Sequence, residues 1–302
     1  MRAIPLALLM LLALLLAPLG LSRYATEILT QGFILALFAS AFNLVFHALG
    51  LLSFGHAAFF GAGAYTAALL AARAGWPYLA TLPLAVLASA TLALVLGFFS
   101  VRTSRIYFTM LTLAFAQLVW AVVHKWYGFT GGDNGITGLE VGVLADPRWL
   151  YYLALSLLGV GLGLLWLVER APLGYALRAT RDNEARAEAI GLSPFWLRLT
   201  GFVLSGAIAG AAGFLQAAWQ RSAFPDFLYW TKSAEAIIAA ILGGSGHLLG
   251  PGLGALAFIE LGAFVQARTE YWPMVLGLVL LFLVLFLPRG LAGLLGGRGA
   301  RG

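Results

Sequence analysis

Apolar stretches of membrane-spanning length make up most of this 302-residue chain. A helix needs about 20 apolar residues to cross the hydrocarbon core of a bilayer. Because backbone N–H and C=O groups find no water there, such stretches must form helices. The candidate spans are residues 3–21, 28–49, 54–72, 78–100, 106–124, 150–168, 199–219, 233–245, 250–267 and 272–288. The sequence therefore predicts an all-α polytopic membrane protein with about ten transmembrane helices.

The scarcity of charge supports a membrane environment. Only 10% of the residues are charged and 62% are hydrophobic, whereas soluble domains carry about 25% charged residues. The absence of cysteine excludes disulfides and thiolate chemistry. In a soluble protein the net charge of +6 would suggest nucleic acid, but here it follows from basic residues on the cytosolic side of a membrane. No nucleic-acid partner is expected.

The distribution of basic residues predicts the orientation. With both termini in the cytosol, eleven basic and four acidic residues fall on the cytosolic side, against seven basic and six acidic residues outside. This asymmetry obeys the positive-inside rule. The chain is then a single transmembrane domain over 1–302, with a charged cytosolic segment at 169–198 and an outer loop at 125–149.

Two regions interrupt the regular pattern of spans. Residues 45–60 are nearly continuous with their neighbours, and 233–245 is short, so each is expected to be a broken or re-entrant element. A Gly-rich, Ser- and His-containing stretch occurs in both regions, at 50–56 and 243–247. Spans one to five and six to ten would run in opposite directions, which is typical of transporters built as inverted repeats. The glycine pairs Gly206/Gly210 and Gly246/Gly250 have the spacing of close helix packing.

The cytosolic segment 169–198 has the composition of a helix. Arg178, Asp182 and Arg186 are spaced four apart, and such pairs stabilise a helix surface by about 0.2–0.5 kcal/mol each. A narrow face of mostly small residues lies beside the charges, at Leu177, Thr180, Glu184, Ala187 and Ile190. A solvated loop explains the arginines but not this face. The segment is therefore predicted to dock onto another protein.

The same segment resembles the loop by which permeases of ATP-binding-cassette (ABC) importers dock into their ATPase subunits. The matching residues are Gly174, Ala179, Arg181, Asn183, Glu184, Ala187 and Gly191. Within that family the segment is similar to the LivM-type permeases of branched-chain amino acid importers. The resemblance implies ATPase docking through Gly174, Arg178, Arg181, Asp182, Asn183, Glu184, Ala187 and Gly191.

The resemblance extends along nearly the whole chain. It is carried by residues 50–65, 107–117, 130–136, 243–244, 250–251 and 286–290. His47 and His247 depart from the family, which usually has a small residue at the first position and often Thr at the second. No substrate role is carried over to these two histidines.

The resemblance implies a fold, partners and a location. The fold is a ten-helix ABC importer permease whose docking loop follows the sixth span, where the charge distribution also places the long cytosolic loop. The partners are a second related permease in a heterodimer, two ABC ATPase subunits and a periplasmic or extracellular solute-binding protein. The location is the cytoplasmic or inner membrane of a bacterium or archaeon. The chain itself binds no cofactor and is no enzyme, because ATP and Mg²⁺ belong to the ATPase subunits. Leucine, isoleucine and valine are the default substrates, with urea, short amides or other amino acids as alternatives.

Polar residues in or near the spans are candidates for the translocation pathway. Each could equally make a hydrogen bond between helices, which contributes about 0.6 kcal/mol on average. Glu235 and Glu260 are the acidic residues inside hydrophobic segments, where carboxylates either have a function or reach the membrane interface. The pathway candidates are Asn43, Ser53, His56, Tyr65, Thr109, Thr112, Gln117 and Glu235.

ATP hydrolysis and metal chemistry by this chain are not expected. A phosphate-binding loop needs Gly-rich backbone followed by Lys and Ser or Thr, and neither Lys125 nor Lys232 follows Gly. The four histidines lack the spacing of metal ligands. They lie at positions 47, 56, 124 and 247.

Two other classes of membrane protein remain as alternatives. Residues 243–246 fit the Gly-x-Ser-Gly pattern of intramembrane serine proteases, in which Ser245 would need a histidine base within hydrogen-bond reach. An ion-coupled secondary transporter would use Glu235 and Glu260 as coupling carboxylates and would need no ATPase partner.

Overall fold

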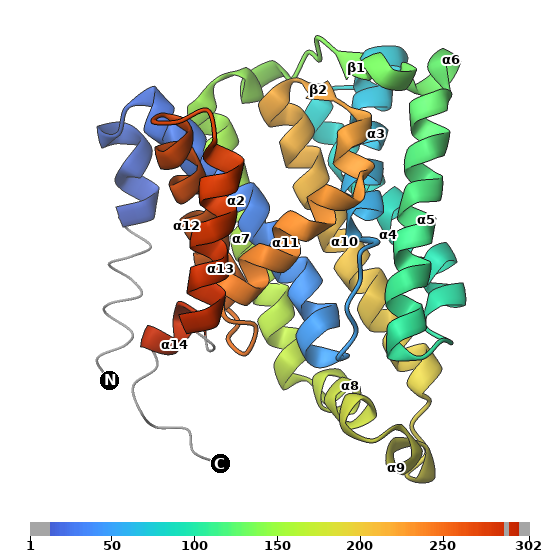
Figure 1. Cartoon of the computed structure of the whole chain (residues 1–302). Coiled ribbons are helices and arrows are strands. Elements are labelled where there is room, and N and C mark those ends of the chain that lie inside the picture. The colour runs from blue at the N-terminus through green and yellow to red at the C-terminus, as the bar shows by residue number, and fades with distance from the viewer. Residues whose placement is uncertain (1–12, 287–289, 296–302) are drawn as a thin grey trace.

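The computed structural model describes residues 13–286 and 290–295, which form a bundle of helices (Figure 1). Residues 13–20 are helical and precede α2 (Arg23–Asn43), which continues as the π-helix η1 (Leu44–Ala48). The helices that follow are α3 (His56–Ala74), η2 (Tyr78–Thr81), α4 (Leu82–Ser100) and α5 (Arg105–Lys125).

Short elements connect α5 to the second half of the chain. They are α6 (Tyr127–Thr130), η3 (Gly132–Asn134), β1 (Ile136–Thr137) and η4 (Gly142–Ala145). The next helices are α7 (Pro147–Arg170), α8 (Pro172–Asp182), α9 (Glu184–Ala189) and α10 (Pro194–Gln220). The chain continues through β2 (Ser222–Ala223), η5 (Pro225–Leu228), α11 (Trp230–Gly243), α12 (Gly250–Gln266), α13 (Trp272–Phe286) and α14 (Ala292–Leu295).

Six helical segments are long and apolar enough to cross a membrane, and each lies at a predicted span. They are Arg23–Ala48, His56–Ala74, Tyr78–Ser100, Arg105–Lys125, Pro147–Arg170 and Pro194–Gln220. The predicted spans at 233–245, 250–267 and 272–288 also contain helices, but α11, α12 and α13 have 14, 17 and 15 residues. Most of the predicted first span, 3–21, lies outside the described residues. A polytopic helical protein is therefore confirmed, and the count of ten spans stays a prediction.

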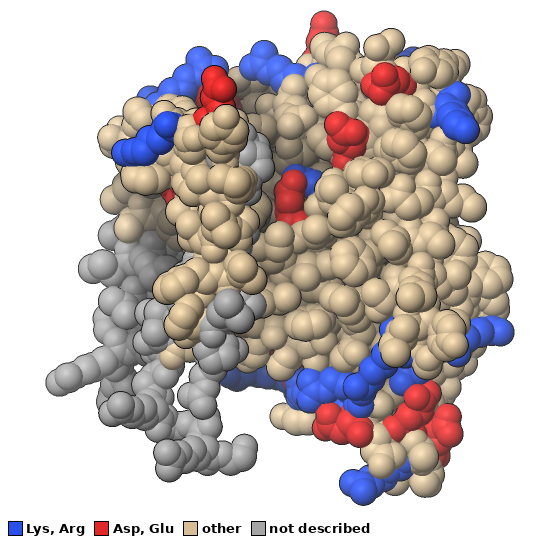
Figure 2. All heavy atoms as spheres, in the orientation of Figure 1, with Lys and Arg blue, Asp and Glu red and all other residues tan. Residues whose placement is uncertain are grey.

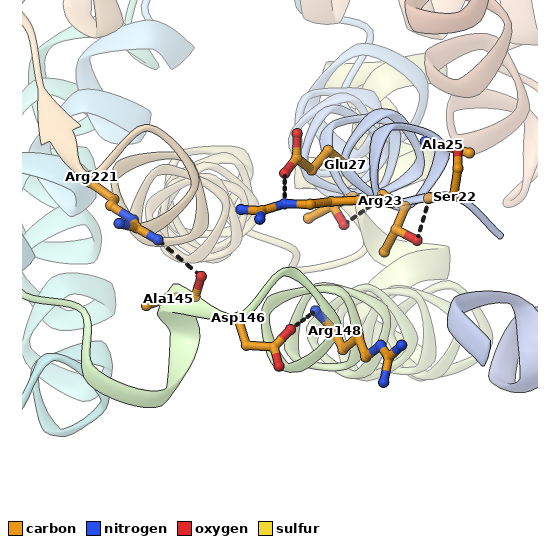
Figure 3. Close-up of polar contacts among 10 residues, drawn as sticks. Ser22, Arg23, Ala25, Glu27, Ala145, Asp146, Arg148 and Arg221 are labelled. Carbon is orange, nitrogen blue, oxygen red and sulfur yellow. Dashed lines mark hydrogen bonds and ion pairs between the residues drawn. The ribbon is translucent and has the colours of Figure 1, made fainter. Parts of the chain in front are cut away.

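Local sequence explains where several helices begin. Proline stands in the first turn of α7, α8 and α10, where its missing N–H costs no hydrogen bond. Asp146 caps α7 by accepting a hydrogen bond from the backbone N–H of Arg148 at 2.9 Å (Figure 3). Asn183 separates α8 from α9 and caps α9 through the N–H of Arg186 at 2.9 Å. The segment predicted to be cytosolic is thus two short helices rather than one.

Helices α2 and α10 form the centre of the bundle. In the most apolar part of each, 83% and 78% of the residues are buried, against 28% for the η2–α4 segment and 17% for α5. Glycine allows α3 and α10 to pack closely, because a Cβ at Gly63 would overlap the carbonyl of Gly210. The predicted packing role of Gly206 is also confirmed, since a Cβ there would overlap Ala93. Gly246 has no such neighbour.

The two ends of the bundle carry most of the charge (Figure 2). At one end β1 pairs with β2 in antiparallel fashion, with Ile136 opposite Ala223. This pairing joins the predicted outer loop 125–149 to the connection between α10 and α11. Helices α8 and α9 lie at the opposite end (Figure 1).

Candidate functional site

Two non-helical stretches interrupt the helices of the bundle. Residues 49–55 are non-helical, and in Figure 1 they run from the α8 end back to the middle of the bundle, where α3 begins. Residues 221–229 hold β2 and η5 and separate α10 from α11. The predicted interruption at 45–60 is therefore confirmed. Non-helical backbone at membrane depth needs hydrogen-bond partners from other parts of the protein.

Ser233, near the start of α11, supplies such partners to the first interruption. Its hydroxyl accepts a hydrogen bond from the N–H of Ala57 at 2.8 Å and donates one to the carbonyl of Phe54 at 2.8 Å. The first N–H groups of α3 have no partner within their own helix, so Ser233 caps α3 from a different helix. The rings of Phe54 and Trp230 meet edge to face beside it, with centroids 6.4 Å apart.

Three of the predicted pathway residues gather at the first interruption. Ser53 Oγ accepts a hydrogen bond from the N–H of Gly55 at 3.2 Å. Thr109 of α5 donates to the carbonyl of Leu52 at 2.8 Å. Thr112 is buried, and a Cβ at Gly55 would lie 3.1 Å from Thr112 Cβ. The structure therefore brings α5 against the non-helical segment.

His56 occupies a fully buried position between three helices. Its Nε2 lies 2.7 Å from Ser205 Oγ, and the Ser205 hydroxyl donates to the carbonyl of Ala41. Because that hydroxyl has a single proton, it must accept its second hydrogen bond from the His56 Nε2–H group. The rings around His56 are those of Phe42, Phe59 and Phe202. In this conformation His56 links α3 to α10 and α2.

The remaining uncharged pathway candidates lie away from the interruption. Asn43 donates its side-chain amide to the carbonyl of Ser245 at 3.1 Å and so joins the end of α2 to the turn after α11. Tyr65 is buried on α3, nine residues or about 13 Å of helix rise beyond its start. Gln117 is half-buried on α5.

Glu235 forms an ion pair that the predicted topology did not include. Glu235 Oε2 lies 2.6 Å from Lys232 Nζ, and their side chains are 36% and 18% exposed. The charge count places Lys232 outside the membrane segments, whereas it lies in the first turn of α11. Both residues line a cavity of about 400 Å³ between α2, α10, α11 and α12. Glu260 of α12 is exposed and does not line it.

The charged segment formed by α8 and α9 is tied to the first interruption through Arg181. The guanidinium of Arg181 donates to the carbonyl of His47 at 2.6 Å, and Arg105 of α5 donates to the carbonyl of Arg181 at 2.8 Å. Gly50 has a φ of 66°, and a Cβ there would lie 2.7 Å from Arg181 Cγ. Only glycine accommodates both this conformation and this contact. The end of α8 thus packs directly on the backbone that leads into α3.

Part of the small-residue face packs inward, whereas its members Glu184 and Ile190 are exposed. Leu177, Thr180 and Ala187 are 0%, 2% and 2% exposed. Of the predicted docking residues, Gly174 and Ala187 are buried, and Arg178 and Arg181 are half-buried. The exposed members are Asp182, Asn183, Glu184 and Gly191.

Two large apolar side chains lie on the exposed side: Ile190, which the sequence placed on the small-residue face, and Tyr175, which it did not single out. Ile190 is 71% exposed and Tyr175 is 64% exposed. The exposed Glu184 forms a bidentate ion pair with Arg198, in which the two guanidinium nitrogens lie 3.0 and 2.7 Å from the two carboxylate oxygens. The surface that α8 and α9 offer to a partner is therefore apolar as well as charged.

The opposite end presents two arginines. Arg23 and Arg221 extend from α2 and from the end of α10 toward one gap (Figure 3). Arg23 Nε lies 3.1 Å from Glu27 Oε1, and Arg221 donates to the carbonyl of Ala145 at 2.9 Å. These side chains line a cavity of about 300 Å³.

Neither metal chemistry nor proteolysis gains support from the geometry. Within residues 13–286 and 290–295, no group of three or more His, Cys, Asp or Glu residues could hold a metal ion. In the same ranges no hydrogen bond joins the hydroxyl of Ser245 to a histidine.

Comparison with known proteins identifies relatives of this chain. Two relatives are the high-affinity branched-chain amino acid transport system permease proteins LivM of Salmonella typhimurium and Escherichia coli. Each is 32% identical over 302 residues, which cover 91% of this chain and 71% of the relative. The autoinducer 2 import system permease protein LsrC of Salmonella paratyphi B is 32% identical over 222 residues, covering 68% of this chain and 63% of that protein.

No solved structure matches the chain. The family model for the permease component of branched-chain amino acid transport systems matches residues 24–284. The match includes both helix interruptions, α8 and α9, and the cavity beside Lys232 and Glu235. The chain therefore belongs to the branched-chain amino acid transport system permease family.

Proposed function

We propose that this chain is the membrane-spanning subunit of an ABC importer for leucine, isoleucine and valine. The observation that carries the proposal is the contact of Arg181 with the backbone of His47 and Gly50. It connects a solvent-exposed helical segment directly to a helix interruption inside the bundle. Such a connection is what a transporter powered by a separate subunit requires. The names of the LivM relatives support the choice of substrate.

ATP binding and hydrolysis take place in two partner ATPase subunits, which dock on α8 and α9. When the ATPases close, they move α8, and Arg181 transmits the movement to residues 47–55. Because Ser233 holds the same segment to α11, both interruptions respond together. The bundle then alternates between outward and inward access.

The translocation path follows the two interruptions. A second, related permease completes it in a heterodimer, and a periplasmic or extracellular solute-binding protein delivers substrate. The predicted candidates at 53, 109, 112 and 235 lie along this route. The β1–β2 end, with Arg23 and Arg221, faces the binding protein, and α8 and α9 lie in the cytosol. Both termini are cytosolic in this arrangement.

The two interruptions also support an inverted repeat of five plus five spans. In the first half a helix ends, the chain turns back without helical structure, and α3 starts within the bundle. In the second half α10, residues 221–229 and α11 follow the same order in the opposite direction (Figure 1). Related halves of opposite orientation place their interruptions at a common central site.

Uptake by the reconstituted complex tests this function. The chain is co-expressed with the second permease, ATPases and binding protein encoded beside it, and the complex is placed in proteoliposomes. We expect ATP-dependent accumulation of radiolabelled leucine, isoleucine and valine, with none when ATP is omitted. Uptake of urea or a short amide in place of these amino acids would reject the substrate and keep the mechanism. Leucine uptake driven by an ion gradient without ATPase subunits would reject the mechanism.

A further inference from the structure

We propose that the cavity between α2, α10, α11 and α12 is a subsite for the charged end of a free amino acid. In this subsite the Lys232–Glu235 ion pair opens, Lys232 binds the substrate carboxylate and Glu235 binds the substrate ammonium group. The inference rests on the proposed function, because it assigns a place in this chain to the substrate of that importer.

The position of the cavity fits a site reached from the outside. Its lining extends on α12 from Gln266, at the last turn, to Phe258. Those eight residues correspond to about 12 Å of helix rise. Figure 2 shows charged side chains in a hollow on this face, apart from those at the two ends of the bundle. The proposed orientation makes the upper rim of this hollow the external one.

The ion pair has unused bonding capacity. Among the described residues, the one hydrogen bond made by either side chain is the 2.6 Å bond that joins them. An ammonium group has three donors and a carboxylate about four acceptor sites. The Lys232 ammonium also lies 5.4 Å from the centroid of the Phe60 ring, a contact that orients it. Charged side chains among membrane-spanning helices are costly. A ligand that carries one positive and one negative charge would explain why Lys232 and Glu235 are present.

The remaining lining suits an apolar amino acid. Four glutamines, which can donate and accept without adding charge, surround the pair: Gln31, Gln216, Gln220 and Gln266. Phe258 and Ile259 supply an apolar wall. The volume of about 400 Å³ lies within the range of small-molecule sites. A zwitterion adds no net charge to the site, whose lining also contains the Asp226 carboxylate as a second possible partner for the substrate ammonium group. Urea, which has no charged groups, gains nothing from the pair.

Thermal unfolding of the permease–ATPase complex, without the binding protein, tests the subsite directly. A ligand that binds the folded state raises the unfolding midpoint. We expect leucine to raise it, and leucinol, which lacks the carboxylate, and 4-methylpentanoate, which lacks the ammonium group, to leave it unchanged. Equal shifts with all three compounds, or no shift with leucine at its solubility limit, would overturn the proposal. This comparison needs no substitution and therefore does not depend on how variants fold.

Transport by a neutral variant provides the second test. Lys232→Gln combined with Glu235→Gln removes both charges and keeps polar side chains. We expect ATP-driven leucine uptake to fall about tenfold or more, since two charged hydrogen bonds are lost, and the leucine-induced shift to disappear. Glu260→Gln is the matched control, because it removes an exposed carboxylate outside the cavity, and it should behave as wild type. Wild-type leucine uptake by the neutral variant would reject the subsite alone, whereas a wild-type complex that imports no amino acid would reject the proposed function.

Discussion

A single buried hydroxyl, that of Ser233, joins the two interrupted helices. It bonds to one backbone donor and one backbone acceptor of residues 54–57, so its loss leaves one buried and one partly buried backbone group without this partner. The sequence did not single out Ser233, because a serine inside an apolar helix is ordinarily a local hydrogen-bonding residue. Its role depends on α3 lying beside α11, which no local pattern encodes. Ser53 and Thr109 were predictable as polar residues in spans, but their backbone partners were not.

Replacement of Ser233 by alanine is therefore expected to destabilise the protein. The two unpaired backbone groups should cost about 1–3 kcal/mol and lower the thermal unfolding midpoint in lipid nanodiscs. Ser156→Ala is the control, because that exposed serine bonds only to the carbonyl of Leu153 in its own helix. Equal midpoints for the two variants would show that the Ser233 cap contributes nothing to stability.

At the scale of elements, the packing of α8 and α9 on the bundle determines which of their side chains are exposed, which helical periodicity alone does not. The spacing predicted one helical face with five members, but the helix breaks at Asn183, and both Glu184 and Ile190 are exposed. The three members that pack inward are Leu177, Thr180 and Ala187. These side chains are buried by the bundle itself, so α8 and α9 turn their other side outward. The helical spans themselves were largely predictable, since in lipid an apolar stretch has few alternatives to a helix.

The outward side of the docking segment should bind the ATPase through Ile190. Ile190→Ser removes a 71% exposed apolar side chain and should lower co-purification of the ATPase subunits without changing the unfolding midpoint of the isolated permease. Val143→Ser, at a 62% exposed position at the β1–β2 end, is the control and should leave co-purification intact. Full ATPase recovery with Ile190→Ser would place the docking surface elsewhere.

Close packing of α3 on α10 should not tolerate a side chain at Gly63. Gly63→Ala places a methyl group on the backbone of Gly210, and backbone cannot move aside as a flexible side chain can. We expect a lower unfolding midpoint and a lower yield of folded protein. Gly163→Ala on α7 meets nothing within 4 Å and should be neutral or slightly stabilising. Equal behaviour of the two variants would contradict the close approach of the helices.

At the scale of the whole molecule, the chain connects a docking surface, two interrupted helices and a charged cavity. The sequence predicted the interruption at 45–60 from glycine content and span spacing. It did not predict that Lys232 joins Glu235 in the bundle, because the charge count assigns basic residues to loops by default. The connection between the parts passes through Arg181, whose guanidinium and carbonyl bond to η1 and α5.

The ratio of leucine imported to ATP hydrolysed, measured in proteoliposomes with Arg181→Gln, tests this connection most directly. Arg178→Gln is the matched control, since Arg178 is on the same helix and bonds to the carbonyl of Glu169 rather than to residues 47–50. We predict that both variants assemble with the ATPases and hydrolyse ATP, and that the ratio falls severalfold only for Arg181→Gln. A ratio for Arg181→Gln equal to that of wild type would contradict the account.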